Sequence, residues 1–370
     1  MPPARTAALT CAAFVLTLAP AVPASASAAE GPLSRTTSVG VHNAYQTGTF
    51  PYFADALDSG AGLLELDVWT DEWFGTWRVN HELVGQDNNC VGATAPEQLR
   101  DGGDGDLADC LRDVRTWHEA NPGHQPLLLK VELKKGYHSA SGLGPAEFDA
   151  LADQVLGDAL FRPGDLLGAH DTLDEAVRAD GWPSRLPPPP GSRFAGGGTP
   201  STDAFGTALP SRDTLAGRVV VYLTPGTFEK GNPFDDLWTD EEQAARLRDL
   251  AAEGAVDEAA TFPAVLGAES GDPRERYDED LRPWFVVFDG SAPSYAGGVD
   301  TSWYGENDYL LVMTDAHAVS PAIDARTPSE DEAAARVREL ARLGATTVTS
   351  DWASLPHVLS MVAPHGSELG

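Results

Sequence analysis

The sequence predicts an α/β fold, a TIM-like (β/α)8 barrel formed by a single domain. Short apolar runs alternate with helical patterns along the chain, which is typical of a mostly parallel sheet covered by helices. Eight such runs can be recognised, and eight parallel strands can close into a barrel. The 370 residues, 42% of them hydrophobic, are enough to bury a large core.

The expected strands are short segments rich in β-branched and aromatic residues. They span residues 38–45, 62–69, 77–82, 126–133, 218–224, 284–289, 309–314 and 346–352. Helical patterns between them include residues 146–160, 240–253 and 329–343. The last begins at Ser329, a favourable N-cap followed by acidic residues, and ends before Gly344.

The first 28 residues differ from the rest and predict a secretory signal peptide, so we expect an extracellular protein. Arg5 precedes an apolar run at residues 7–19, and the alanines at 24, 26 and 28 offer A-x-A cleavage sites. A membrane anchor is the alternative, but the run is shorter than the roughly 20 residues that span a bilayer. The catalytic domain would then comprise residues 29–370.

The cysteine count supports export. Removing the leader removes Cys11 and leaves Cys90 and Cys110. Two cysteines in an exported chain most simply form a disulfide, and two free thiols are the alternative.

One segment, about 185–200, reads "RLPPPPGSRFAGGGTP" and is too rich in proline and glycine for a helix or strand. We interpret it as a long surface connection within the barrel, and a boundary between two domains is the alternative.

The charge is strongly negative. A formal net charge of -31 argues against nucleic-acid binding, because the protein surface would repel a phosphate backbone. It also disfavours simple adhesion to anionic membranes. Such a charge suits a soluble monomer, or a protein that offers carboxylates to a cation.

Two expected strands carry charged residues at alternate positions. Glu65 and Asp67 in "GLLELDVW" point to one side, and so do Lys130, Glu132 and Lys134 in "LLLKVELKKG". The apolar residues between them point the other way, towards the covering helices. Charges inside a barrel are costly unless they pair or bind a metal, so this pattern indicates either a metal site or structural salt bridges.

Two histidines follow strands that lead into this cluster. His42 and Asn43 end the first expected strand in "SVGVHNAY", and both can face the site only if the chain turns there. His81 closes the third expected strand in "RVNHE". Barrel active sites form at the carboxyl ends of strands, which favours a catalytic role over the ordinary one of a lone histidine.

The candidate metal ligands are all oxygens. Asn43, Glu65, Asp67 and Glu132 suit a hard cation, calcium or magnesium, and disfavour zinc. A divalent ion beside two histidines and a lysine is equipped for phosphodiester chemistry.

The motifs "HNAY", "LELDVW", "NHE" and "KVELKKG", in this order and spacing, resemble the secreted bacterial calcium-dependent phosphatidylinositol-specific phospholipases C. The resemblance continues through "LADCLRDVRTWHEANPGHQPLLLK", "GWPSRLPPPP", "LAGRVVVYLTP" and "ATTVTSDW", and so covers most of the mature chain. It implies a PLC-like phosphodiesterase barrel. It also implies cleavage of phosphatidylinositol on the diacylglycerol side of the phosphate, with the inositol 2-hydroxyl attacking phosphorus to give a cyclic phosphate.

The resemblance also implies roles for single residues. The four oxygen ligands match the family's calcium ligands. His42 matches the group that contacts the pentacoordinate phosphoryl group, and His81 the general acid for the leaving oxygen. Lys134, with Lys130 beside it, matches a substrate phosphate contact.

The chain departs from the family pattern at two places. Ala44 stands where a serine is usual. The segment "RVVVYLTP" lacks the lysine that contacts phosphorylated headgroups in eukaryotic relatives, so the resemblance does not imply a preference for phosphorylated inositides.

Two other functions fit parts of the pattern. A glycerophosphodiester phosphodiesterase or sphingomyelinase D type enzyme shares the barrel and the carboxylates, but usually begins with H-R-G. A non-catalytic calcium-dependent binding protein would not need both histidines.

The segment "WTDEWFGTW" places four aromatic rings between the second and third expected strands. The rings could cap the barrel core. Gly75 instead indicates a tight turn whose tip exposes Trp73 and Phe74, and we expect these two to make transient contact with a membrane surface.

Overall fold

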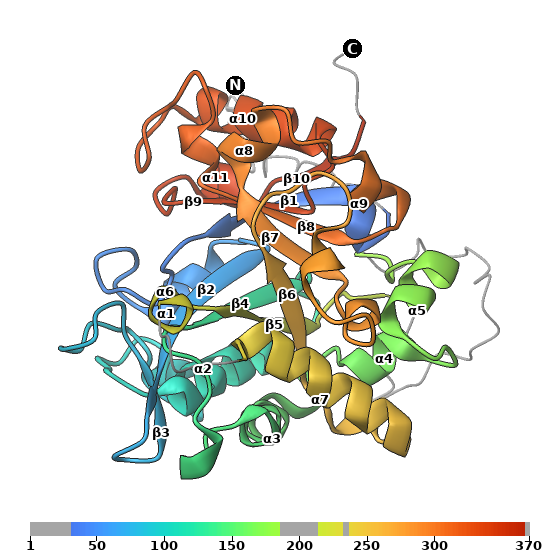
Figure 1. Cartoon of the computed structure of the whole chain (residues 1–370). Coiled ribbons are helices and arrows are strands. Elements are labelled where there is room, and N and C mark those ends of the chain that lie inside the picture. Colours follow the sequence, from blue (N-terminus) through green and yellow to red (C-terminus); the bar gives the residue numbers. More distant parts are fainter. Residues whose placement is uncertain (1–30, 186–213, 232–236, 367–370) are drawn as a thin grey trace, which may run out of the picture.

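The computed structural model describes residues 31–185, 214–231 and 237–366 of the chain. Eight of its strands form the barrel and two lie outside it (Figure 1). The barrel strands are β1 (Thr36–Val41), β2 (Leu63–Asp71), β4 (Leu127–Leu133), β5 (Val219–Pro225), β6 (Thr261–Leu266), β7 (Val287–Ser291), β8 (Leu310–Thr314) and β9 (Thr347–Ser350). The two others are β3 (Thr76–Val79) and β10 (Val362–Pro364).

The eight barrel strands are parallel and form a closed ring. Their hydrogen-bonded order is β1, β9, β8, β7, β6, β5, β4 and β2, and β1 then pairs with β2. β3 and β10 pair antiparallel with β2 and β1 respectively. The structure therefore confirms the predicted (β/α)8 barrel.

The count of eight strands was right, but one expected strand was wrong. Residues 77–82 do not enter the barrel, because β3 is the returning arm of a hairpin whose turn is closed by Gly75 at φ +66°. The barrel strand that the sequence pattern did not reveal is β6. It contains Pro263, which lacks the amide hydrogen that a central strand donates, so its pattern argues against a strand.

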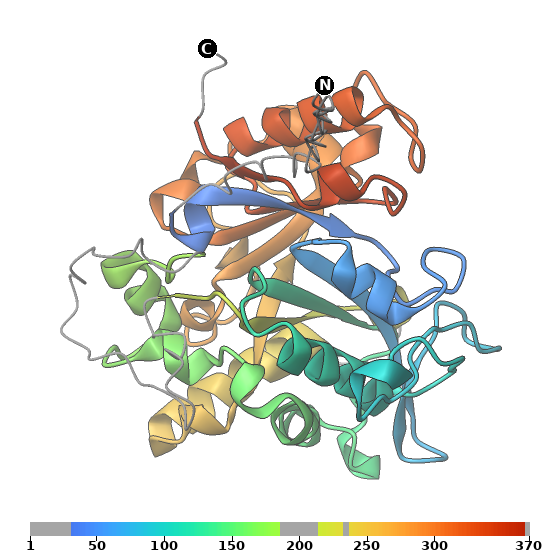
Figure 2. The same ribbon diagram turned by 180° about the vertical axis from the view of Figure 1, so that it is seen from behind.

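Helices surround the barrel on its outer face (Figure 1 and Figure 2). They are α1 (Phe53–Asp58), α2 (Leu107–Ala120), α3 (Pro145–Leu156), α4 (Pro163–Leu167), α5 (Leu173–Asp180), α6 (Thr227–Lys230), α7 (Thr239–Glu253), α8 (Ala292–Ala296), α9 (Ser302–Glu306), α10 (Glu330–Arg342) and α11 (Pro356–Leu359). The three expected helices correspond to α3, α7 and α10. Ser329 caps α10 through a reciprocal bond pattern with Glu332, as the sequence indicates.

The strands divide apolar and charged residues between the two faces of the barrel wall. The intervening apolar residues, Leu64 and Leu66 on β2 and Val131 and Leu133 on β4, are fully buried in the hydrophobic core. Closure of the ring depends on Gly40. A Cβ there would lie 2.7 Å from Cβ of Leu63, too close for any side chain.

Some sequence predictions fall outside the described residues. These are the signal peptide at residues 1–28 and, except for Arg185, the surface connection at 185–200. Within the described ranges, none of the helices has both the length and the apolar character needed to cross a bilayer.

Cys90 and Cys110 form a disulfide, and both residues are fully buried. The bond joins the segment after β3 to helix α2. The backbone beside it is fixed by Asp113, whose carboxylate accepts hydrogen bonds from the amides of Val91 and Ala93 at 2.8 and 2.7 Å.

Loss of this disulfide should destabilise the protein. The two cysteines are 20 residues apart, and closing a loop of that length stabilises the folded state by roughly 3 kcal/mol in the chain-entropy estimate. We expect the double variant Cys90→Ala/Cys110→Ala to lose about that much unfolding free energy in urea titrations. Peptide mass mapping without reductant that found both thiols free would contradict the prediction.

Candidate active site

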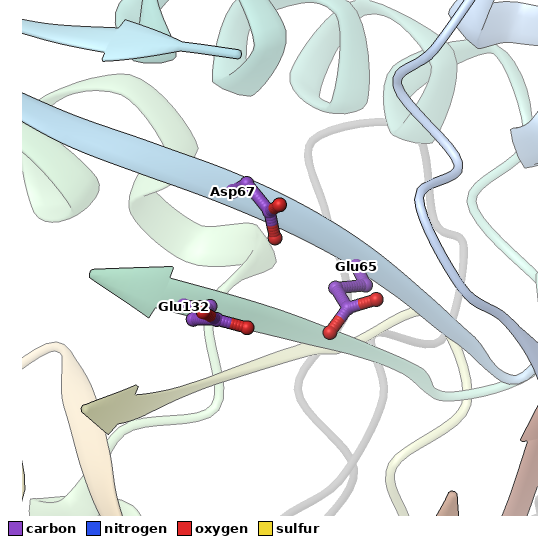
Figure 3. A group of neighbouring side chains, drawn as sticks. All are labelled: Glu65, Asp67 and Glu132. Atoms are coloured by element: carbon purple, nitrogen blue, oxygen red, sulfur yellow. The ribbon is translucent and has the colours of Figure 1, made fainter. Parts of the chain in front are cut away.

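The charged side chains on β2 and β4 meet inside the barrel because the two strands pair in parallel register. Glu65 lies beside Lys130, and Asp67 lies beside Glu132. Figure 3 shows the three carboxylates on these neighbouring strands. The period-two pattern in the sequence thus correctly predicts which residues share the inner face.

The three carboxylates are close enough to hold one cation. One oxygen from each of Glu65, Asp67 and Glu132 lies within 4.8 Å of the others. Two ligands on opposite sides of a Ca²⁺ ion are separated by about 4.6–5.2 Å, twice the usual Ca–O distance. Glu65 and Asp67 are buried, so their charges need compensation.

Asn43 completes the set of oxygen donors. β1 ends at Val41, and Asn43 adopts a left-handed backbone conformation with φ of 53°. Its amide donates to Oε2 of Glu65 at 3.2 Å. Its side-chain Oδ1 is buried and has no hydrogen-bond partner, an arrangement that a cation ligated by this oxygen would satisfy. The residues present therefore fit a calcium ion.

Two lysine ammonium groups already lie between the carboxylates. Lys134 Nζ is 3.0 Å from both Asp67 and Glu132. Lys130 Nζ is 3.1 Å from Glu65 and 3.0 Å from Asp289 on β7. Sequence reasoning missed Asp289, although it was the last residue of an expected strand.

The local charges shift the carboxylate pKa values in opposite directions. Burial raises the pKa of Glu65, but the charges of Lys130 and His42, together with the hydrogen bonds from Lys130 and the amide of Asn43, lower it by more, so that its pKa lies below the ordinary value. Burial and the charges of Glu65 and Glu132 raise the pKa of Asp67. The carboxylates of the cluster thus repel one another, and a divalent cation would offset this repulsion.

His42 lies at the edge of the cluster. Its Nδ1 donates to Oδ1 of Asp351 at 3.0 Å, and its Nε2 lies 3.2 Å from Nδ2 of Asn43 and 3.5 Å from Glu65. Partial burial lowers the pKa of His42, but the bond to Asp351 and the charge of Glu65 raise it by more, to about 9. Asp351 and Glu65 therefore favour the protonated form of the ring. Asp351 was not anticipated, although it directly follows the last barrel strand.

His81 does not close a barrel strand as expected. It lies two residues beyond the end of β3, on the returning arm of the hairpin, with its side chain 45% exposed. The adjacent amide of Asn80 donates to the carbonyl of Asp67 at 3.1 Å, which holds this arm at the barrel mouth. Nδ1 of His81 contacts Glu82 at 2.9 Å. His42 and His81 line one cavity of about 690 Å³.

A third histidine, missed by sequence reasoning, lies beside the cluster. His317 follows β8 and lines a smaller cavity of about 150 Å³ together with His42, Glu65 and Lys130. Its Nδ1 is 3.0 Å from Oγ of Ser350. The sequence carries no clear signal for it, because no other chemical motif surrounds it.

The hairpin beside the site divides its aromatic rings between the core and the surface. Trp69 and Trp77 are buried, whereas Trp73 and Phe74 at the turn are 88% and 81% exposed. The tip of the hairpin therefore presents two large rings to the surroundings, as the sequence indicates.

Comparisons with known proteins agree with this geometry. The model of the Ca²⁺-dependent phosphoinositide phospholipase C family matches residues 104–186. The chain has no match among curated proteins.

Two solved structures resemble the chain over nearly its whole length. A Ca²⁺-dependent phosphatidylinositol-specific phospholipase C from Streptomyces antibioticus is 52% identical, with a TM-score of 0.82 over 91% of this chain and 99% of that one. A calcium-dependent phosphoinositol-specific phospholipase C from a Pseudomonas species, in a myoinositol complex, is 19% identical with a TM-score of 0.59 over 90% and 95%, and shares the fold. The first likeness shows that the chain belongs to the family of calcium-dependent phosphoinositide phospholipases C.

Proposed function

We propose that this calcium-dependent phosphatidylinositol phosphodiesterase cleaves its lipid by attack of the inositol 2-hydroxyl on phosphorus, which releases diacylglycerol and a cyclic inositol phosphate. The observation that carries the proposal is the convergence of the Glu65, Asp67 and Glu132 oxygens next to His42, which is 3.5 Å from Glu65 and lines a cavity together with His81. The 52% identity to the phosphatidylinositol-specific enzyme supports the substrate.

Asn43, Glu65, Asp67 and Glu132 would hold the calcium ion. Bound there, calcium supplies positive charge for the phosphoryl oxygens as negative charge builds up on them. The ligands come from three successive barrel strands or their ends, so the rigid register of the sheet fixes their relative positions.

The two histidines would have different tasks. His42, kept protonated by Asp351 and Glu65, is suited to contact the pentacoordinate phosphoryl group as a cation. His81 has Nε2 available when Nδ1 is bound to Glu82, and it would act as the general acid that protonates the diacylglycerol oxygen.

The lysines would complete the phosphate contacts. Lys134 lies one residue past the end of β4, beside Asp67 and Glu132, and is the proposed direct contact. Lys130 is held between two carboxylates deeper in the barrel, so it would act on the phosphate through its charge.

The protein would be exported and act as a monomer. The leader-like composition of residues 1–28 and the buried disulfide both support an oxidising, extracellular location. The net charge of -31 supports a protein that stays monomeric in solution.

Contact with the lipid surface would occur through an apolar rim at the barrel mouth. In the part of the chain that the structure describes, the large exposed hydrophobic residues are Trp73, Phe74, Leu83, Val84, Phe228 and Leu237. All six lie in the β2–β3 hairpin, the segment after β3 or the connection that follows β5.

Parts of this apolar rim are joined by direct contacts to Trp69. The ring of Phe228 packs on Trp69 with centroids 4.9 Å apart, and the guanidinium of Arg78 lies 6.0 Å from the Trp69 centroid. Arg78 also donates to the carbonyl of Leu83 at 2.7 Å. These contacts connect Phe228 and the segment after β3 to the base of the hairpin.

Removing calcium should abolish product formation. Phosphorus NMR of phosphatidylinositol vesicles should show a cyclic phosphate signal with calcium and none in excess EDTA, because the carboxylate site would lack its cation. A glycerophosphodiester phosphodiesterase or sphingomyelinase D type enzyme would give no cyclic inositol phosphate. Full turnover by a metal-stripped sample in EDTA would contradict the assignment.

Calcium should also raise the melting temperature of the protein, because it binds the folded state. Asp67→Asn should reduce this rise while the calcium-free variant still folds, because the substitution removes one of three repelling carboxylates. An unchanged calcium-dependent rise in this variant would exclude Asp67 as a ligand.

Replacing either proposed catalytic histidine should lower turnover strongly. We expect His42→Ala and His81→Ala each to lose on the order of 10²- to 10⁴-fold in kcat with the fold intact. His170→Ala is the matched control, since this histidine pairs with Asp180 away from the cavities described above. If His81→Ala kept half its activity on a substrate with a poor leaving group, the general-acid role would be wrong.

Removing a ring from the hairpin tip should impair activity on membranes selectively. Trp73→Ala or Phe74→Ala should lower the rate on phosphatidylinositol vesicles several-fold more than the rate on soluble glycerophosphoinositol. Glu258→Ala, exposed just before β6 at the opposite end of the barrel, should affect neither rate. Equal losses on both substrates would mean that the rings serve the catalytic site.

A further inference from the structure

Lys130 is shared between a proposed calcium ligand and a carboxylate outside the ligand set. Its Nζ lies 3.1 Å from Oε1 of Glu65 and 3.0 Å from Oδ2 of Asp289. Asp289 belongs to β7, which is separated from β4 by two strands, so Lys130 reaches across the barrel interior. All three residues are at most 7% exposed, so solvent screens these charges little.

Asp289 is itself held in place by Tyr222. The Tyr222 hydroxyl donates to Oδ2 of Asp289 at 3.0 Å, and Tyr222 on β5 pairs in register with Lys130 on β4. The tyrosine is fully buried. The carboxylate therefore faces Lys130 from a fixed position and not from a mobile loop.

The charges inside the barrel mouth match a divalent cation only if Asp289 is included. Four carboxylates, Glu65, Asp67, Glu132 and Asp289, surround two ammonium groups, those of Lys130 and Lys134. The neighbouring pair of protonated His42 and Asp351 adds one charge of each sign and leaves this balance unchanged. Two net negative charges remain, which one calcium ion neutralises. Without Asp289 a single negative charge would remain, and Lys130 would have only Glu65 as its close partner.

We propose that Asp289 is a positioning residue that sets the calcium affinity of the site by taking up part of the charge of Lys130. Lys130 can then fix the orientation of Glu65 without cancelling its negative charge. The inference rests on the proposed calcium site and adds a residue to which that site assigns no role.

The test is a charge series measured by calorimetric titration of CaCl₂ into the metal-stripped, full-length protein. Asp289→Asn should weaken calcium binding by on the order of tenfold to a hundredfold, because the site loses one negative charge in a poorly screened environment. Lys130→Met should tighten it. Lys130→Met/Asp289→Asn should bind with nearly the wild-type Kd, because the net charge is restored.

Two further variants separate charge from structure. Asp289→Glu keeps the charge and should stay within a few-fold of the wild-type Kd. Asp149→Asn removes a buried carboxylate paired with Arg246 at 2.7 Å outside the calcium cluster, and should lower stability without changing the calcium Kd.

The rank order of the Kd values decides the outcome. A double variant that binds calcium as weakly as Asp289→Asn would overturn the proposal, because removing the charge of Lys130 would then fail to offset the loss of Asp289. Equal Kd values throughout would do the same. If Asp289→Asn fails to fold, the Kd values of Lys130→Met, the wild type and the double variant still test the same coupling.

Failure of this inference is distinguishable from failure of the proposed function. A wild-type protein that binds no calcium would overturn the site and this proposal together. Wild-type binding with the rank order lost would overturn only the role of Asp289.

Discussion

Two lysine ammonium groups inside the barrel each bridge two carboxylates, and the geometry of the mouth depends on these bridges. Burying an unpaired carboxylate costs several kcal/mol, so Glu65, Asp67 and Asp289 could not lie together without them. Lys130 and Lys134 are two of only four lysines in a chain of net charge -31. Two of the few lysines therefore lie beside buried carboxylates, which water cannot solvate.

The parallel register of β2 and β4 brings these carboxylates and lysines together in one site. Because side chains alternate along a strand, Glu65 and Asp67 share the inner face with Lys130 and Glu132, while the leucines and valines between them join the outer core. β2 then continues past the barrel wall and pairs with β3 in the hairpin. One strand thus links the metal ligands to the exposed rings of Trp73 and Phe74, which ties the proposed lipid contact to the proposed chemistry.

Sequence patterns predict local periodicity well and long-range neighbours poorly. The barrel, the three carboxylates and the two lysines followed from alternation within strands. β6 did not, because Pro263 removes the amide that marks a central strand, and residues 77–82 were mistaken for a barrel strand because a hairpin arm has the same composition. Asp289 and Asp351 reach the site from strands far along the chain, so their roles depend on ring closure, which no local pattern encodes.

At the proposed membrane contact, electrostatic repulsion by the lipid and burial of aromatic rings in the lipid involve different parts of the protein. Repulsion between an acidic protein and an anionic lipid surface is screened beyond about 8 Å at physiological ionic strength. Full burial of a large aromatic ring removes about 150–250 Å² from water, worth up to about 4–6 kcal/mol at 25 cal/mol per Å². Trp73 and Phe74 extend on a hairpin tip, so they can insert while most of the acidic surface stays farther from the lipid. A calcium ion in the mouth would further reduce the negative potential on the side that faces the substrate.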